Sequence, residues 1–409
     1  MTETLTLATR GSDLALTQAE TVRDALSTRK REVEIRRVET RGDQIPDEQI
    51  HRLGRTGAFV RALDEEVLAG DADLAVHSLK DVPTEGMEDM VVAGVPERAP
   101  SGDVLVHPDG LALAELPAGT VVGTGSLRRT AQIAAARPDL TVEPIRGNVD
   151  TRIEKLLAPG LQAEHERRLI AAGEAAALTA ESAAEESDGD MDDDAAEESD
   201  GDTDDDAAEE SFERSVEEWF DSLSELERSA MERSVDVEYD ALVMAEAGLR
   251  RSGLYDDDRM SRLPREEFVP AAGQGVIAVT AADPDVVEAV RSAIDHPRTR
   301  IAATVERTVL GTLNGGCIAP IGVSALVQGE YVHTRARVLS TDGTEEVAEA
   351  RDLPIESHAR AAEAFAEDLA ERGAAELIQR AREEADAATD ASTGGAETVM
   401  RGSEEGDGE

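Results

Sequence analysis

The sequence has little lysine and a large deficit of positive charge. Its 89 acidic residues outnumber 41 basic residues, only three of which are lysine, and the formal net charge is −48. Non-specific binding to nucleic acid requires cations that displace counterions from phosphate. Docking on an anionic membrane surface likewise requires basic segments. The composition therefore argues against nucleic acid and membrane as partners.

Cysteine and long apolar runs are also scarce. The single cysteine, Cys317, excludes an intramolecular disulfide and a cysteine-rich metal cluster. No apolar run approaches the ~20 residues of a membrane span. The first residues lack the basic and apolar regions of a secretory signal. We therefore expect a soluble, cytoplasmic protein.

The acidic residues are densest in two stretches. Residues 181–221 contain 21 acids and one base, and a twelve-residue unit occurs there twice in tandem, from Glu186 and from Glu198. This stretch and residues 383–409 have too few apolar side chains to offset the entropy of ordering, so we expect both to be disordered. An amphipathic helix over residues 212–231 is the alternative for that part. The repeat lacks the bidentate glutamate of a calcium loop, so no metal is expected.

The rest of the chain is acidic too, which a charged tail alone does not explain. Such a composition resembles that of proteins from extreme halophiles. In molar salt the Debye length is about 3 Å, so repulsion among surface carboxylates is screened.

Strand and helix patterns alternate along the remaining sequence. Apolar runs typical of short strands are separated by helical spacing of apolar residues, and they lie at residues 5–9, 33–38, 72–76, 91–95, 120–123, 141–145, 239–244 and 276–280. This alternation predicts parallel α/β sheets covered by helices on both faces. Residues 321–353 instead have the pattern of a three-stranded meander, with a helix from about Ser357, which predicts a small α+β domain.

Arginines follow several predicted strands. Gly123-Thr-Gly-Ser-Leu-Arg-Arg129 leaves a strand and opens a helix, whose free N–H groups and dipole favour an anion. Similar layouts occur at Thr9–Ser12, Arg146–Arg152 and Arg250–Arg251. One arginine at a strand end is more often solvated or ion-paired than a ligand. Four such clusters in so acidic a chain predict a site for a polyanion, and guanidinium groups suit carboxylates.

Two other loops carry candidate reactive groups. In His77-Ser-Leu-Lys-Asp-Val-Pro83, Asp81 is either a general acid or cation stabiliser, or only a turn cap. In Gly315-Gly-Cys-Ile-Ala-Pro320 the glycines allow close approach of a ligand to a reactive thiol, whereas a buried, inert cysteine is the alternative. A non-enzymatic anion-binding module and a cysteine-dependent hydrolase remain possible from the residues alone. The first would not need both reactive groups, and the second would not need so many arginines.

Taken together, the motifs resemble those of one family, porphobilinogen deaminase, also called hydroxymethylbilane synthase. The resemblance covers about residues 4–157 and 237–380, which is everything except the acidic insert and tail. The matching motifs, in order, are Thr9–Ser12, Thr40–Asp43, His77–Pro83, Gly125–Arg129, Arg146–Val149, Ala247–Leu249, Ala272–Gly275 and Gly315–Cys317.

The resemblance implies a fold of two α/β domains similar to periplasmic binding proteins and a small C-terminal α+β domain. We expect the largely disordered acidic insert at residues 158–236 and a disordered tail at 386–409. The expected domains are 1–97 with 276–295, 98–157 with 237–275, and 296–385.

The resemblance also implies an activity. The family condenses four porphobilinogen molecules into 1-hydroxymethylbilane and releases ammonia. It acts as a monomer on a dipyrromethane cofactor, which the cysteine matching Cys317 holds through a thioether. Asp81 matches the catalytic aspartate, which assists departure of the amino group and stabilises pyrrolic cations. The positions that match cofactor-binding residues are Lys80, Ser126, Arg128, Arg129, Arg146, Gly147, Gln274 and Gly275, and those that match substrate-binding residues are Arg10, Ser12, Arg152 and Arg251. Thr56 departs from the family pattern, because many relatives have lysine there.

Overall fold

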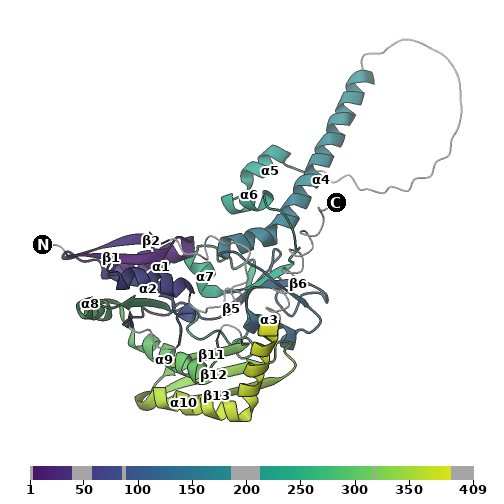
Figure 1. The fold of residues 1–409 in the computed structure, drawn as a ribbon. Coiled ribbons are helices and arrows are strands. Elements are labelled where there is room, and N and C mark those ends of the chain that lie inside the picture. Colours follow the sequence, from purple (N-terminus) through teal and green to yellow (C-terminus); the bar gives the residue numbers. More distant parts are fainter. Residues whose placement is uncertain (1–2, 39–57, 85–88, 186–211, 317–318, 388–409) are drawn as a thin grey trace, which may run out of the picture. The chain divides into compact units, whose positions relative to one another are not determined.

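The computed structural model of the chain describes residues 3–38, 58–84, 89–185, 212–316 and 319–387 (Figure 1). Of residues 58–59 and 174–185 only the backbone is described. The chain divides into two compact units, Met1–Arg152 with Tyr239–Glu409, and Ile153–Glu238. The larger unit contains three sheets among its described residues, and the smaller unit is helical.

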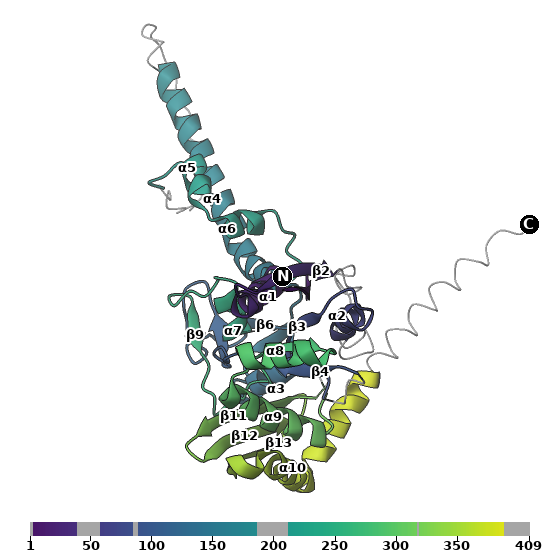
Figure 2. The same cartoon turned by 90° about the vertical axis from the view of Figure 1, so that its left-hand side faces the viewer.

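The first sheet has the strand order β2-β1-β3-β10-β4. Strands β1 and β3 run parallel to β2, whereas β10 is antiparallel to both of its neighbours. Helices α1 and α8 pack on one face of this sheet (Figure 2). Their contacts come from apolar residues spaced three or four apart, such as Ala19 and Val22 of α1 and Val286 and Val290 of α8. Helix α2 packs with a second cluster of strand residues. The bounds are β1 Glu3–Arg10, α1 Asp13–Leu26, β2 Arg31–Val38, α2 Ala58–Leu68, β3 Leu74–Ser78, β4 Val91–Gly94, β10 Ile277–Ala281 and α8 Pro284–Ile294.

The second sheet repeats this layout in the order β7-β6-β8-β5-β9. Strand β6 is parallel to β7 and β8, whereas β5 is antiparallel to β8 and β9. Leu105, Val122, Ile133, Val243 and Phe268 form its core. The bounds are β5 Asp103–Val106, β6 Val121–Thr124, α3 Leu127–Ala136, β7 Thr141–Pro144, β8 Ala241–Ala245, α7 Glu246–Arg251 and β9 Met260–Arg262.

The prediction of purely parallel sheets is wrong at β5 and β10. The chain leaves the first sheet after β4 and enters the second with β5. It leaves the second after β9 and returns to the first with β10. A helical crossover within one sheet brings the next strand back parallel. These two strands arrive from the other sheet, so no such crossover sets their direction.

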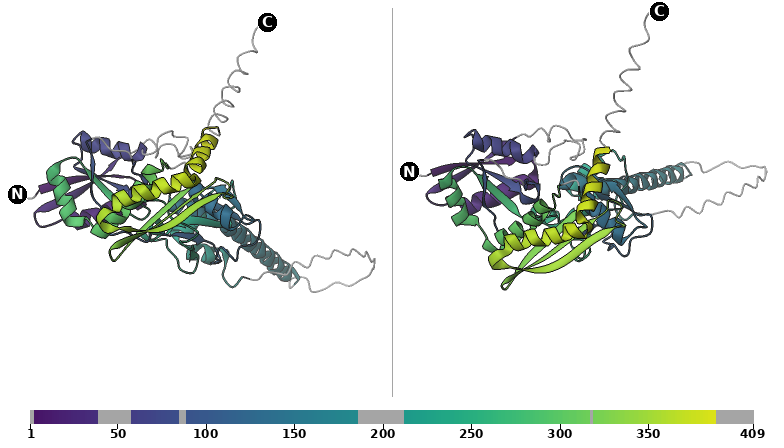
Figure 3. Two further views of the ribbon diagram at one scale, coloured as in Figure 1. Left: turned by 90° about the horizontal axis from the view of Figure 1, so that it is seen from below. Right: turned by 60° about the horizontal axis from the view of Figure 1, so that its bottom comes forward.

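The third sheet is the predicted meander, with β11 Ile321–Gln328, β12 Tyr331–Leu339 and β13 Glu346–Pro354. Helix α10, His358–Leu369, confirms the helix expected from about Ser357. It lies along the sheet in Figure 3, and it shares one apolar core with alternate strand residues and with α9, Pro297–Thr312. The sequence pattern did not predict α9. The predicted fold class, α/β sheets followed by a small α+β part, is confirmed.

The smaller unit contains most of α4, Val149–Glu185, together with α5, Val216–Ser222, and α6, Glu225–Met231. Trp219 of α5 is buried and stacks on His165 of α4, with ring centroids 5.9 Å apart. Gln162 donates hydrogen bonds to the carbonyls of Met231 and Arg233, 3.2 and 2.8 Å long. Among the described helices, none combines the length and the hydropathy that a membrane span requires.

These helices correct the expectation that residues 158–236 are largely disordered. Residues 158–185, 216–222 and 225–231 are helical. Ser215 and Ser224 each form a capping box, with Glu218 and Glu227 respectively, and this motif stabilises the start of a short helix. Residues 186–211, which include both copies of the acidic repeat, lie outside the described residues, as does the tail from residue 388.

Candidate functional site

Lys80 and Asp81 lie at one edge of the first sheet. They belong to a short 3-10 turn, Leu79–Asp81, that directly follows β3, and both side chains are exposed. Arg10 ends β1, and Ser12 is the N-cap residue of α1 with no capping bond from its hydroxyl. Because β1 and β3 are adjacent and parallel, these residues gather at the same edge.

The predicted residues of the second sheet gather in the same way. Ser126 precedes α3 after β6, Arg146 follows β7, and Arg251 ends α7 after β8. These three strands are parallel neighbours, so the residues share one edge. Gly248 of α7 lies so close to α1 that a β-carbon there would be 3.9 Å from Leu14. The two edges that carry the predicted residues therefore approach each other where α1 lies beside α7.

The second edge concentrates positive charge at Arg152. Its Nε donates a 2.9 Å hydrogen bond to the carbonyl of Gly147, whose φ of +108° and contact with Thr151 leave no room for a side chain. A β-carbon on Gly125 would lie 3.2 Å from Arg152 Nη2, so glycine leaves space above the guanidinium. Burial and the nearby Arg129 cation lower the pKa of Arg152 to about 10. A bound carboxylate would relieve this repulsion.

Three of the predicted ligand residues also belong to a buried network around Asp103. Arg128 Nη2 lies 2.8 Å from Asp103 Oδ2, and Arg129 Nη2 lies 2.9 Å from Asp103 Oδ1. Arg128 also donates to the carbonyl of Val269 at 2.7 Å. Gln274 donates to Asp103 Oδ1 at 2.8 Å and is 2% exposed. Asp103 is absent from the predicted site residues, and its only signal in the sequence is an acid at the start of an apolar segment.

The electrostatic balance of this network favours the ionised carboxylate. Burial raises the pKa of Asp103, but the charges of Arg128 and Arg129 and the hydrogen bonds from them lower it to about 2. Asp103 thus keeps its charge at any pH near neutral and holds both arginines at the start of α3.

Replacing Asp103 with asparagine is expected to lower the free energy of unfolding by about 3–5 kcal/mol at neutral pH, because two buried cations lose their counter-ion. A carboxyl pKa of about 2 lies below the unfolded value of about 3.9. The stabilisation is therefore full above about pH 4 and is lost as the pH falls through about 2. Denaturant unfolding in concentrated salt, repeated across that pH range, measures the difference in free energy of unfolding between parent and variant.

The matched control is Asp139→Asn. It removes the exposed partner of Arg137, which lies 2.7 Å away. It should leave the denaturant concentration at the midpoint of unfolding nearly unchanged. An Asp103→Asn protein as stable as the parent at pH 7 would show that the network contributes little.

Two segments connect the first two sheets, residues 95–102 and residues 263–276, and together they form the crossing. Gln274 and Gly275 form hydrogen bonds between these two segments. Gln274 Nε2 donates to the carbonyl of Ser101 at 2.8 Å, and Ala99 N donates to the carbonyl of Gly275 at 3.1 Å. Gly275 has φ +81°, and a β-carbon there would lie 2.7 Å from the oxygen of Ala99. Arg251 Nη2 donates to the same Gly275 carbonyl at 2.8 Å. These two predicted cofactor residues therefore shape the crossing and position Arg251.

Glu306 of α9 joins the third sheet to the same crossing. It is fully buried and accepts hydrogen bonds from Arg98 Nη1 and Nη2 at 2.6 and 3.1 Å. It also accepts from the backbone N–H groups of Gly273 and Ala325, each at 2.7 Å. No sequence pattern indicates a buried role for this carboxylate, because an acid in a helix is ordinarily solvent-exposed.

Cys317, Thr56 and the segment Thr40–Asp43 lie outside the described residues. The start of the cysteine loop is described. Gly315 N donates to the carbonyl of Leu310 at 2.9 Å, and a β-carbon on Gly315 would lie 2.2 Å from Ile321 Cδ1. A larger residue at Gly315 would therefore displace the side chains of Ile321 and Leu310.

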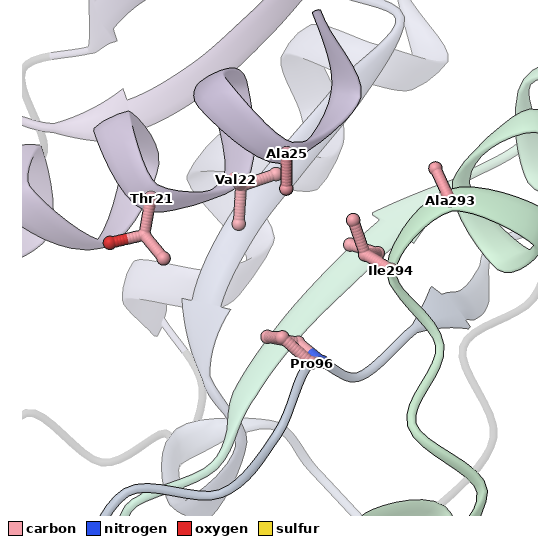
Figure 4. Close-up of a pocket in the computed structure, with 6 residues that line it drawn as sticks. All are labelled: Thr21, Val22, Ala25, Pro96, Ala293 and Ile294. Carbon is pink, nitrogen blue, oxygen red and sulfur yellow. The ribbon is translucent and has the colours of Figure 1, made fainter.

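A small apolar cavity of about 190 Å³ lies elsewhere in the larger unit (Figure 4). Its lining contains no charged side chain, which distinguishes it from the arginine-rich edges. The lining residues are Thr21, Val22, Ala25, Pro96, Ala293 and Ile294.

Comparison with known proteins gives matches along most of the chain. The model of the porphobilinogen deaminase dipyromethane cofactor binding domain matches residues 5–178 and 225–288, and that of the porphobilinogen deaminase C-terminal domain matches residues 300–379. A probable porphobilinogen deaminase of Halobacterium salinarum is 55% identical over 392 residues, which cover 93% of this chain and 98% of the relative.

More distant relatives match over similar lengths. A probable porphobilinogen deaminase of Methanococcoides burtonii is 33% identical and covers 92% of this chain and 96% of its own length. The porphobilinogen deaminase of Campylobacter hominis is 30% identical, with 93% and 98% covered. Among solved structures, the ectoine binding protein TeaA of a TRAP transporter covers 94% of this chain and 99% of its own, with 9% identity and a TM-score of 0.30, which is too low to support a conclusion.

Proposed function

The chain belongs to the porphobilinogen deaminase family, and on that premise we propose that Asp81 and the cationic residues of the two edges form its active site. The protein is an enzyme of tetrapyrrole biosynthesis that makes hydroxymethylbilane from porphobilinogen, with a dipyrromethane cofactor. This confirms the activity and the cofactor expected from the sequence. Each named residue role is part of the proposal.

Asp81 is the proposed catalytic residue. Its turn is fixed by backbone hydrogen bonds from Leu79 N to the carbonyl of Val276 at 2.9 Å and from Val82 N to that of Leu79 at 3.2 Å. A carboxyl group held on such a turn can, in its protonated form, transfer a proton to the departing amino group, and the carboxylate that results stabilises the positive charge that develops on a pyrrole ring. Lys80, the residue before Asp81, would bind a carboxylate of the cofactor.

The donor set of the two edges fits a ligand that carries carboxylates. Guanidinium groups bind carboxylates through paired, charge-assisted hydrogen bonds. When bound to Cys317, dipyrromethane supplies the pyrrole carbon to which the first porphobilinogen is joined. The residues that would hold its carboxylates are Lys80, Ser126, Arg129, Arg146 and Gly147, whereas Arg10, Ser12, Arg152 and Arg251 would serve incoming substrate. Arg128, Gln274 and Gly275 support these residues from the buried network and the crossing.

The three sheets support the three expected domains, each built around its own core. The proposed domains are residues 1–97 with 276–295, 98–157 with 237–275, and 296–385. We also propose that the enzyme acts in the cytoplasm as a monomer, with no nucleic-acid partner. The net charge supports the last point, and the family resemblance supports the monomer, which sedimentation would measure.

The observation that carries the proposal is that the edge with Asp81 and the edge with Arg152 approach each other where α1 lies beside α7. Arg152→Gln is expected to lower kcat/KM for porphobilinogen about tenfold or more, chiefly through KM, because a cation that binds carboxylate is lost. Steady-state kinetics in concentrated salt measure this. The control is Arg259→Gln on the exposed loop before β9, where Arg259 lies 3.9 Å from Asp256, and its kinetics should match those of the parent. An unchanged KM in Arg152→Gln would remove this arginine from the site.

A further inference from the structure

Arg307 of α9 makes all of its described hydrogen bonds to one turn of the first sheet. Its Nη1 donates to the carbonyl of Val82 at 2.7 Å and to that of Leu79 at 3.5 Å. Its Nη2 donates to the carbonyl of Pro83 at 2.5 Å. These three carbonyls surround the turn that carries Lys80 and Asp81, so a side chain from the third sheet's helix holds the backbone of that turn.

Among the described residues, the guanidinium of Arg307 therefore binds backbone carbonyls and not a carboxylate. The neighbouring internal arginines Arg98, Arg128 and Arg129 each pair with a carboxylate. Arg307 has no carboxylate within ion-pair distance in the described part of the chain. Burial lowers its pKa, as expected when a cation is removed from water without a counter-ion. Its charge is compensated by the carbonyls of the turn, so the desolvation cost is offset only while the turn keeps this conformation.

A second contact lies one helical turn further along α9. Gly311 stands four residues after Arg307, on the same face of the helix. A β-carbon on Gly311 would lie 3.5 Å from Cβ of Thr84, so the helix passes directly beside the end of the same segment. Helix α9 ends at Thr312, and Cys317 follows five residues later.

The opposite side of the turn is held by the crossing between the first two sheets. Gly273 has φ +74°, and a β-carbon there would lie 3.2 Å from Lys80 N. The N–H of Gly273 donates to Glu306, the residue that precedes Arg307. Glu306 and Arg307 are consecutive residues of α9. Glu306 therefore binds the crossing, and Arg307 binds the Asp81 turn.

We propose that Arg307 is a positioning residue, which fixes the Lys80–Asp81 turn to the helix that leads to Cys317. The inference rests on the proposed role of Asp81. The turn itself is short and carries its functional side chains in solvent, so its own hydrogen bonds do not determine where the carboxylate stands relative to the third sheet. Arg307 supplies that constraint. A displacement of about 1 Å of a catalytic group can cost about a hundredfold in rate.

The test compares Arg307→Met with Arg298→Met in the full-length enzyme in concentrated salt. Arg298 lies on the same helix and donates to the carbonyl of Val327 at 2.6 Å, within the third sheet and its helices, so it is the matched control. Arg307→Met is expected to lower kcat about tenfold to a hundredfold with KM within about threefold. Intact mass should show that the cofactor is still attached. Arg307→Lys should recover part of the rate, because one ammonium group reaches fewer of the three carbonyls.

Hydrogen exchange provides a readout that does not depend on activity. Peptides that span residues 79–84 should exchange severalfold faster in Arg307→Met and at the parent rate in Arg298→Met. A parental kcat in Arg307→Met would overturn the inference. So would a rate loss accompanied by faster exchange throughout the protein, or an equal loss in Arg298→Met. If Arg307→Met does not fold, the same comparison is made with Arg307→Lys.

The failure of this inference can be told apart from failure of the proposed function. If Asp81→Asn keeps its turnover, Asp81 is not the catalytic residue, whatever the exchange of residues 79–84 shows. If Asp81→Asn is inactive and Arg307→Met is unaffected, the catalytic assignment stands and the positioning role of Arg307 is wrong.

Discussion

An Asp81→Asn enzyme is expected to keep its cofactor and to lose about a hundredfold to ten-thousandfold in kcat. Asparagine has nearly the same shape as aspartate, but it cannot transfer a proton and cannot balance a positive charge on a pyrrole ring. The side chain is exposed at the end of a turn held by backbone hydrogen bonds, so the substitution should leave the fold intact. Steady-state turnover of porphobilinogen, together with intact mass, measures both parts of the expectation.

The matched control for this substitution is Asp71→Asn. Asp71 is also exposed and lies just before β3, where its carboxylate is 3.7 Å from Arg36. Its kinetics should equal those of the parent, since surface ion pairs contribute little. Near-parental turnover in Asp81→Asn would contradict the role assigned to this carboxylate.

A Cys317→Ala protein is expected to carry no covalent cofactor and to have no measurable turnover. A thioether requires the cysteine sulfur, and Cys317 is the only cysteine in the chain, so no other thiol can replace it. The parent should exceed its sequence mass by a two-pyrrole adduct, and the variant should have its sequence mass. Intact-mass spectrometry of both proteins, purified in the same salt, makes the comparison.

Thermal unfolding separates this chemical effect from a loss of fold. The variant should show a cooperative transition, because alanine is small enough for a loop that begins with two glycines. A parent that is active at its unmodified sequence mass would contradict the covalent attachment at Cys317.

Much of the site could be predicted because its residues are local to strand ends. A run such as Leu5–Thr9 followed by Arg10 and Gly11 shows in the sequence where a strand stops and a ligand loop begins. The parallel arrangement then brings such loops to one edge of a sheet. The gathering of Arg10 with Asp81, and of Ser126 with Arg146, follows from this rule alone.

The supporting residues could not be predicted because their roles depend on contacts distant in sequence. The structural role of Asp103 depends on its ion pairs with Arg128 and Arg129, which lie about 25 residues later in the sequence on another element. The structural role of Glu306 depends on its ion pair with Arg98, which lies 208 residues away in the sequence. Helix α9 was missed because its buried face combines small residues such as Ala302 and Ala303 with this acid, which obscures the apolar periodicity. Strand β5 has only four residues and begins with an aspartate.

The order of strands along the chain has a consequence for synthesis. Strand β10 lies between β3 and β4 in the first sheet. It is synthesised only after all strands of the second sheet and the insert, so β3 and β4 lack their common neighbour until then. The nascent first lobe therefore exposes unpaired strand edges while the rest is translated. The helical insert lowers one entropic cost of assembling the second sheet. By pairing α4 with the segment after α6, through Gln162 and through Glu154 with Arg233, it brings its own two ends together. The chain entropy lost when β8 joins β6 is then that of a short loop rather than of the whole insert.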